Sequence, residues 1–302
     1  MSVQTPNSTS SGPEIEFRHV SLRFDEKPAL IDVSFQLARG EMIFVTGKSG
    51  SGKSVLLHLA IGLIKPDEGQ IFIRGREIET LDEAELVAVR GGSMGMVFQE
   101  DSLFTGMSVY DNVAYRLEEF GWPEEKIEKA VGEVLRFVSL EGEEERFPEE
   151  LSGGMKRRVE IARALIGWPS IMLLDEPTIE LDPIVAVQVI DLIIRARDIN
   201  KISSLYVTKK MYELPYLANY HAVDDGKGGI VVREAPLDEL PQTRVILLDN
   251  GRIIFTGGFD EFQQSDLPTV NELVALDPHD HSKDPYFPDP WDKRRRPKEE
   301  IL

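Results

Sequence analysis

The sequence MIFVTGKSGSGKS, residues 42–54, decides the fold of this chain. Its first five residues are typical of a buried strand, and the apolar run that follows at 55–59 is typical of a helix. Between them, residues 47–54 match the pattern G-x-x-x-x-G-K-S. Glycines let backbone amides converge on phosphate oxygens, and a helix N-terminus adds partial positive charge there. The stretch therefore predicts a phosphate-binding loop, with a Gly/Ser linker before an ordinary helix as the alternative.

The loop assigns a role to each of its side chains. Lys53 is placed to reach the β- and γ-phosphates of a nucleoside triphosphate, and the Ser54 hydroxyl to hold Mg²⁺. The expected phosphate contacts are Gly47, Lys48, Ser49, Gly50, Ser51, Gly52, Lys53 and Ser54.

Composition excludes several other classes of function. The chain has 302 residues, 34 basic against 53 acidic, and a net charge of −19. Such a chain repels nucleic acid and anionic lipid headgroups, so we expect neither as a direct partner. It has no cysteine and no apolar run of the ~18–20 residues that cross a membrane. Residues 1–13 lack the features of a secretory signal and are expected to be a disordered leader, so we expect a cytoplasmic protein.

Strand and helix patterns alternate along the chain. Polar and apolar residues alternate at 15–24 and 31–37, while 170–174 and 203–207 are continuous apolar runs typical of strands buried on both faces. Further strands are expected at 70–75 and in a hairpin over 245–255, and helices at 124–138, 156–166 and 184–197. This order favours an α/β fold with a largely parallel sheet.

Three regions stand apart from that pattern. Residues 110–147 are helical and acidic, and we expect them to form an inserted helical subdomain. Residues 223–242 combine glycines with carboxylates and are expected to be a surface insertion. From 267 onward the chain is rich in Pro and Asp and ends in a basic run at 291–298, which favours a solvated tail over a partner-binding segment.

A second pair of candidate residues ends the apolar run at 171–174. Asp175 is placed to hold Mg²⁺, and Glu176 to polarise the water that attacks the γ-phosphate. Taken alone, an apolar strand ending in Asp-Glu is better explained by a polar strand end.

A third motif, Leu151-Ser152-Gly153-Gly154-Met155, precedes a helix. Its hydroxyl and exposed amides form a second anion site, which one chain does not need for the same nucleotide. The economical arrangement is a head-to-tail homodimer in which Ser152, Gly153 and Gly154 close on the nucleotide of the other copy. An N-cap role for Ser152 is compatible with this.

Together these motifs resemble those of the ATP-binding subunit of an ABC transporter, over residues 14–262. They are the phosphate loop, Val97-Phe98-Gln99, Leu151 to Gly154, Leu173 to Pro177, and Glu180-Leu181-Asp182. The resemblance implies a P-loop NTPase with a RecA-like parallel sheet core, an antiparallel β subdomain and an inserted helical subdomain at about 100–165. It also implies an ABC ATPase domain over 14–265, a C-terminal extension over 266–302, and ATP with Mg²⁺ as ligands.

The resemblance gives roles to three more residues. Gln99 would touch Mg²⁺ and the attacking water, and Asp182 would cross the dimer seam, although Asp182 also suits an N-cap before Pro183. Phe24 would stack on adenine, with an ordinary core or turn phenylalanine as the alternative.

The chain departs from the family pattern in its signature. Met155 stands where glutamine is common, and basic residues follow it at 156–158. This variant is similar to the Mla/Mce branch, whose ATPases drive lipid transport, as are Phe147 to Glu150 and Met107 to Val113.

A second departure lies at the position of the family's switch histidine, where this chain has Lys209. Lysine carries donors but no acceptor and is protonated at neutral pH. We expect Lys209 to pair with the γ-phosphate but to orient water and Glu176 poorly, with full competence as the alternative.

The sequence thus favours an ATPase that energises lipid transport through a separate ABC permease, bound to the inner face of the cell membrane through that permease. The alternatives are a weakly hydrolysing ATP-gated scaffold and an ABC ATPase of another transport or soluble system. The permease is expected to dock on residues 100–113, where Leu103, Phe104, Met107 and Val109 either form a partner groove or are buried in the subdomain.

Overall fold

A computed structural model describes residues 12–275 of the chain and contains a six-stranded central sheet. Its order is β12-β11-β3-β8-β7-β6, parallel throughout except for β12, which pairs antiparallel with β11. The strands are β3 (Met42–Thr46), β6 (Met94–Val97), β7 (Ile171–Asp175), β8 (Ser203–Val207), β11 (Thr243–Asp249) and β12 (Arg252–Gly257).

The central sheet is buried on both faces. Along β3, Met42 and Phe44 belong to one apolar cluster, and Ile43 and Val45 belong to another. Successive side chains of a strand point to opposite faces, so a strand covered on both sides reads as a continuous apolar run. This explains why β3, β7 and β8 could be predicted from sequence.

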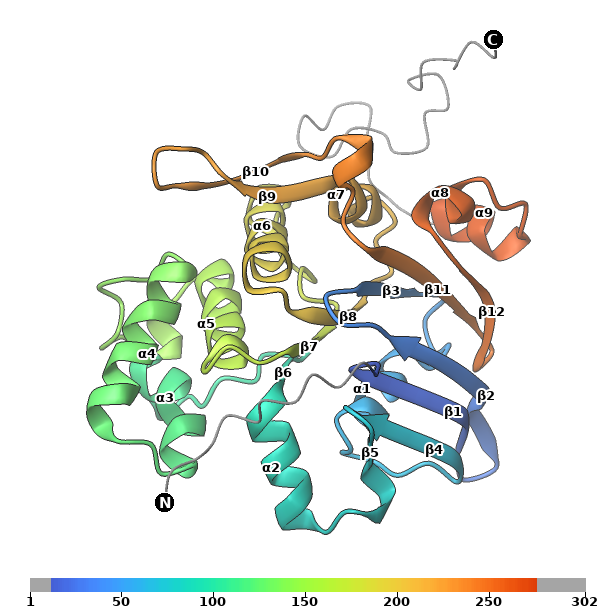
Figure 1. The fold of residues 1–302 in the computed structure, drawn as a ribbon, viewed down its shortest axis with the longest axis horizontal. Coiled ribbons are helices and arrows are strands. Elements are labelled where there is room, and N and C mark those ends of the chain that lie inside the picture. The colour runs from blue at the N-terminus through green and yellow to red at the C-terminus, as the bar shows by residue number, and fades with distance from the viewer. Residues whose placement is uncertain (1–11, 276–302) are drawn as a thin grey trace.

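Two layers cover these faces (Figure 1). One cluster includes an antiparallel sheet of order β2-β1-β4-β5 and α1 (Lys53–Ala60). Its strands are β1 (Ile15–Phe24), β2 (Lys27–Leu37), β4 (Glu68–Ile73) and β5 (Arg76–Glu77), followed by η1 (Ile78–Thr80) and α2 (Glu83–Ser93). The other cluster is helical, with α6 (Pro183–Asn200) and α7 (Glu213–Asn219) over the sheet.

The helical region contains three packed helices, drawn in green in Figure 1. They are α3 (Val109–Glu119), α4 (Glu124–Phe137) and α5 (Gly153–Leu165), with η2 (Pro148–Glu150) before α5. Ser108 caps α3 in a reciprocal capping box with Asp111. On α4, the predicted apolar stripe is buried: Ile127, Val131, Val134 and Leu135.

In the C-terminal third, the structure adds a hairpin that was not predicted and contradicts one expectation, that of a solvated tail from 267 onward. The insertion at 223–242 contributes to a hairpin of β9 (Tyr220–Asp224) and β10 (Ile230–Glu234), followed by η3 (Leu237–Glu239). The segment after 267, expected to be a solvated tail, begins with α9 (Pro268–Ala275), which follows α8 (Phe259–Gln263) and buries Val270 and Leu273. Residues 1–11 of the leader expected at 1–13, and the basic run at 291–298, lie outside the described residues. Within residues 12–275, no helix combines the length and apolar character required to cross a bilayer.

Candidate nucleotide-binding site

The predicted site residues follow the carboxyl ends of four neighbouring parallel strands. The loop at 47–54 follows β3, Gln99 follows β6, Glu176 follows β7, and Lys209 follows β8. Parallel strands bring these ends to one edge of the sheet, where α/β proteins commonly bind ligands. The topology therefore brings together residues as far apart in the chain as Gly47 and Lys209.

The backbone of the loop requires glycine at two positions. Gly52 has φ +104, and a Cβ added there would lie 2.6 Å from the carbonyl oxygen of Ala29. A Cβ at Gly47 would collide with the carbonyl oxygen of Leu248, which lies at the end of β11. Both glycines thus let the loop pack closely against its neighbours while Gly52 turns the chain into α1.

Lys53 is buried, in the first turn of α1. Its Nζ donates to the carbonyl oxygens of Gly47, at 2.8 Å, and Lys48, at 2.9 Å, so its ammonium group lies inside the curve of the loop. Burial lowers the pKa of Lys53, while the nearby carboxylates of Glu176 and Asp175 act in the opposite direction. This group is a desolvated cation held where the pattern places phosphate.

The carboxylate of Asp175 is suited to a cation. It is almost fully buried, it accepts a hydrogen bond from Ser54, and its Oδ1 has no hydrogen-bond partner within the described residues. Burial raises its pKa, against the effect of the Ser54 hydrogen bond. Because buried carboxylate oxygens are normally paired, this orphaned oxygen beside a hydroxyl fits a magnesium ion that also takes phosphate and water oxygens.

Glu176 and Lys209 form an ion pair at the same edge. Lys209 Nζ lies 3.1 Å from Glu176 Oε2, with 45% of the lysine side chain and 11% of the glutamate side chain exposed. Glu176 has φ +44, the left-handed region that side chains other than glycine rarely adopt, and its amide donates to the carbonyl of Val207 at 3.0 Å. Two neighbouring strand ends thus join Glu176 and Lys209, two of the three residues to which sequence assigned catalysis; the third is Gln99.

Gln99 is held through its backbone by α5. Arg157 donates to the carbonyl oxygens of Phe98, at 2.7 Å, and Gln99, at 3.2 Å. Glu160 accepts from the amide of Ser102 at 2.8 Å, and Arg163 donates to the carbonyl of Ser102 at 2.8 Å. The Gln99 side chain itself is exposed.

The remaining predicted residues share no hydrogen bond or ion pair with this cluster within residues 12–275. Ser152 caps α5, its Oγ accepting from the amide of Met155 at 3.3 Å, and Ser152 and Gly153 are exposed. No hydrogen bond or ion pair within residues 12–275 joins Ser152, Gly153 or Gly154 to the phosphate loop. Asp182 caps α6 by accepting hydrogen bonds from the amides of Ile184 and Val185, which is the N-cap role that its position before Pro183 predicted. Phe24 ends β1 with 51% of its surface exposed, so it is not a core residue.

Sequence reasoning missed two contacts of this edge. Glu213, at the start of α7, is fully buried and accepts hydrogen bonds from Thr178, two residues after Glu176, and from Thr208, which precedes Lys209. A single Glu in a short helix carries no sequence signal of burial. Glu272 of α9 pairs with Lys48 of the phosphate loop, a contact between segments that sequence placed in separate regions.

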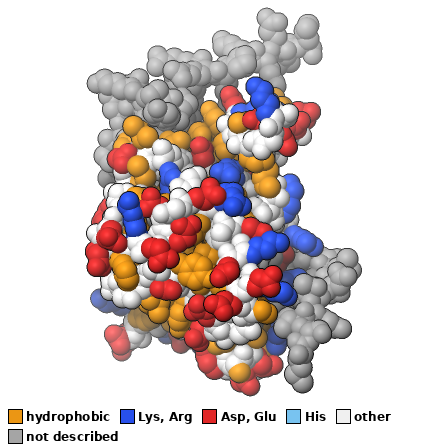
Figure 2. All heavy atoms as spheres, turned by 90° about the vertical axis from the view of Figure 1, so that its left-hand side faces the viewer, with side chains coloured by type: hydrophobic (Ala, Val, Ile, Leu, Met, Phe, Trp, Pro, Cys, Tyr) orange, Lys and Arg blue, Asp and Glu red, His pale blue; other side chains and the backbone are white. Residues whose placement is uncertain are grey.

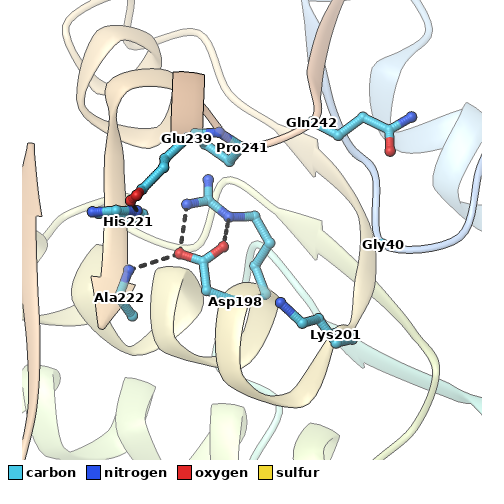
Figure 3. A pocket seen from close by; sticks show the side chains of 9 residues that line it. Gly40, Asp198, Lys201, His221, Ala222, Glu239, Pro241 and Gln242 are labelled. Carbon is cyan, nitrogen blue, oxygen red and sulfur yellow. Dashed lines mark hydrogen bonds and ion pairs between the residues drawn. The ribbon is translucent and has the colours of Figure 1, made fainter. Parts of the chain in front are cut away.

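A pocket of about 240 Å³ lies at the opposite edge of the sheet, near Gly40 before β3 and Gln242 before β11 (Figure 3). In it, Arg197 Nε donates to Asp198 Oδ1 at 2.6 Å, and Asp198 Oδ2 accepts from the amide of Ala222 at 2.8 Å. These bonds attach β9 to α6, so we assign a structural role to the ion pair of Arg197 and Asp198.

A larger groove of about 480 Å³ runs between α2, β6 and α3. Three exposed aromatic residues line it, Phe104, Tyr115 and Phe120, together with the partly buried Phe98. Of the residues expected to form a partner groove, only Phe104 is there. Leu103 and Val109 are buried in the core, so for these two residues the alternative, burial in the subdomain, was right.

Comparison with known proteins agrees with this geometry. A family model described as ABC transporter matches residues 30–179. The chain is similar to the methionine import ATP-binding protein MetN of Leifsonia xyli, with 36% identity over 265 residues that cover 86% of this chain and 71% of that protein. It is also similar to the chloroplastic protein TRIGALACTOSYLDIACYLGLYCEROL 3 of Arabidopsis thaliana, with 36% identity over 269 residues that cover 86% and 73%.

The comparisons also bear on length and fold. The chain spans 63% of the length of the MetN of Brucella abortus. A solved ATP-binding cassette, dimeric and bound to ADP and Pi in a post-hydrolysis state, has a TM-score of 0.67 and 27% identity, covering 81% of this chain and 98% of its own. This likeness confirms the predicted P-loop NTPase fold with a helical region. The family match and these relatives show that the chain belongs to the ABC transporter family and is an ATP-binding and ATP-hydrolysing protein of that family.

Proposed function

We propose that this chain is the subunit that hydrolyses ATP to energise transport through a separate membrane permease. The observation that carries the proposal is the cluster of Lys53, Ser54 and Asp175 beside the Glu176–Lys209 pair. It combines a desolvated cation, a hydroxyl and an unpaired buried carboxylate oxygen with a carboxylate that can activate water.

Binding of ATP follows from this arrangement. The ammonium group of Lys53, held by two loop carbonyls, would turn to the β- and γ-phosphates, whose charge attracts it more strongly. Ser54 and Asp175 would hold Mg²⁺, with Gln99 contributing from the end of β6. When bound, the ion neutralises charge that develops on the phosphate oxygens.

Hydrolysis would depend on Glu176. Its carboxylate accepts the hydrogen bond of a water and directs that water at the γ-phosphate. Lys209 competes for the same carboxylate through their ion pair, and it offers no acceptor to hold the water. We therefore propose slow hydrolysis, with Lys209 contacting the γ-phosphate once ATP is present.

The test of this proposal is the variant Glu176→Gln. It keeps the size of the side chain but removes the base, so we expect ATP turnover to fall at least about 10²-fold while ATP affinity stays the same. Turnover should be measured as phosphate release, and affinity with a fluorescent ATP analogue. Wild-type turnover in this variant would contradict the assignment.

Complete closure of the site requires a second copy of the chain. Ser152 and Gly153 are exposed at a helix start, beside the partly exposed Gly154, and within residues 12–275 no hydrogen bond or ion pair joins them to the phosphate loop, which suits contact with a nucleotide held by a partner. The dimeric state of the related cassette supports this arrangement. We propose a head-to-tail homodimer, with Asp182 near the seam and Phe24 on the adenine.

The groove between α2, β6 and α3 is the proposed docking site of the permease. Exposed aromatic residues are common at the centres of protein interfaces. Figure 2 shows the face at the left-hand side of Figure 1, where apolar side chains gather among many acidic ones. A partner with an apolar helix flanked by basic residues would complement such a surface, and it would place the chain at the inner face of the membrane.

The cargo is set by the permease. The Met155 signature supports lipid transport, and the name of the Arabidopsis relative supports a lipid-related role. The MetN relatives do not support the lipid branch and favour methionine instead. The complex of chain and permease decides between them: stimulation of ATP turnover by phospholipid but not by L-methionine supports lipid transport, and the reverse supports methionine import.

A further inference from the structure

Glu213 is a fully buried carboxylate directly below the catalytic edge. It begins α7, its exposed fraction is 0%, and its oxygens accept hydrogen bonds from three hydroxyl groups. The donors are Thr178 Oγ1, Tyr206 OH at 2.9 Å and Thr208 Oγ1 at 2.9 Å. Burial raises the pKa of Glu213, and the cation of Lys210, 3.8 Å away, acts against this.

Two of these hydroxyls belong to the segments that carry the candidate catalytic pair. Thr178 lies two residues after Glu176, and Thr208 immediately precedes Lys209. One carboxylate therefore binds both chain segments at the point where they leave β7 and β8. Lys210 strengthens the connection, because its Nζ donates to the carbonyl of Thr178 at 2.7 Å and its amide to Thr208 Oγ1 at 3.0 Å.

The local backbone needs such support. Glu176 has φ +44, a conformation that costs energy in a residue with a side chain and persists only where neighbours hold it. A buried carboxylate is itself costly, and an apolar residue would fill the same space without that cost. A charged group at this position is therefore better explained by the hydrogen bonds it directs than by packing.

We propose that Glu213 is a positioning residue for ATP hydrolysis, which fixes Glu176 and Lys209 relative to each other through Thr178 and Thr208. The inference rests on the proposed role of Glu176 as the base. A small displacement of either segment would misplace the attacking water while leaving the phosphate loop, and so ATP binding, unchanged.

The test compares Thr178→Val with Thr178→Ser in the full-length chain. Valine keeps the size of threonine but removes the hydroxyl that Glu213 accepts, whereas serine keeps the hydroxyl. We expect valine to lower kcat about 10- to 100-fold, with KM for ATP and analogue affinity within about twofold of wild type, and serine to restore most of kcat. If Thr178→Val does not fold, Thr208→Val and Thr208→Ser give the same comparison.

The matched control is Asp191→Asn. Asp191, on α6, accepts a hydrogen bond from Tyr216 OH of α7 at 2.9 Å, so it also anchors α7 but touches neither catalytic segment. Its kcat should stay near wild type. Equal kcat in the valine and serine variants, or an equal loss in Asp191→Asn, would overturn the positioning role. Wild-type turnover in Glu176→Gln would instead overturn the base assignment, which separates the two failures.

Discussion

At the residue scale, the chemistry of this site depends on Lys209. A neutral imidazole at this position could both donate and accept hydrogen bonds, whereas lysine can only donate them. Here the ammonium group of Lys209 pairs with the carboxylate of Glu176, the group proposed to activate water. The ion pair itself could not be predicted from the sequence, because Glu176 and Lys209 meet only where the neighbouring strands β7 and β8 end.

The variant Lys209→His tests this interpretation. Removing the cation frees Glu176, and an imidazole can orient water and phosphate together, so we expect turnover to rise about 10²-fold at saturating ATP. Steady-state phosphate release at saturating ATP measures this change. If the Lys209→His variant shows no gain, Lys209 is fully competent.

At the scale of elements, close contact between β6 and α5 depends on one small residue. A Cβ at Gly95 of β6 would collide with the backbone carbonyl oxygen of Ala164 in α5, whereas a Cβ at Gly132 of α4 would meet nothing within 4 Å. The helical region therefore packs tightly against the sheet edge, while α4 has an open position on its surface.

These two glycines give opposite predictions for stability. Gly95→Ala should lower the free energy of unfolding by about 1–3 kcal/mol, because α5 must move away from β6. Gly132→Ala should raise it by up to about 1 kcal/mol, since alanine favours the helix. Urea unfolding of both variants measures this, and a destabilised Gly132→Ala would contradict the packing described here.

The same scale shows what sequence could and could not predict. Continuous apolar runs identified β7 and β8, and the motif pattern identified Lys53, Asp175 and Glu176, because each is a local signal. The hairpin of β9 and β10 was missed because glycines and carboxylates in 224–229 indicated a loop, although the flanking strands pair in register. Glu213 was missed because burial of a carboxylate depends on hydroxyls from distant segments.

At the scale of the whole molecule, we propose that the site is one half of a larger assembly. The phosphate loop and the signature are on different parts of the surface, and dimerisation would bring each to its counterpart. In this arrangement, the phosphates held by one copy attract the helix start at the signature, residues 151–155, of the other copy. Dimerisation should therefore require ATP and should be sensitive to charge at the signature.

Gly153 offers a matched pair for this test. Its Cβ position is open, so both Gly153→Ala and Gly153→Asp should fold, but only aspartate places a negative charge against the partner's phosphates. In the Glu176→Gln background with ATP and Mg²⁺, light scattering should show twice the 34.0 kDa of the chain for alanine and a monomer for aspartate. A monomeric parent under these conditions, with its permease present, would refute the head-to-tail arrangement.

The bonds from α5 to the segment at 98–102 have a mechanical consequence. Arg157, Glu160 and Arg163 are three residues apart, on one face of α5, and they hold both ends of that segment. The segment also lines the groove through Phe98 and Ser102. A rotation of α5 that swings its amino end toward a second protomer would pull on the wall of the groove through these bonds, so force applied at either place would reach the other.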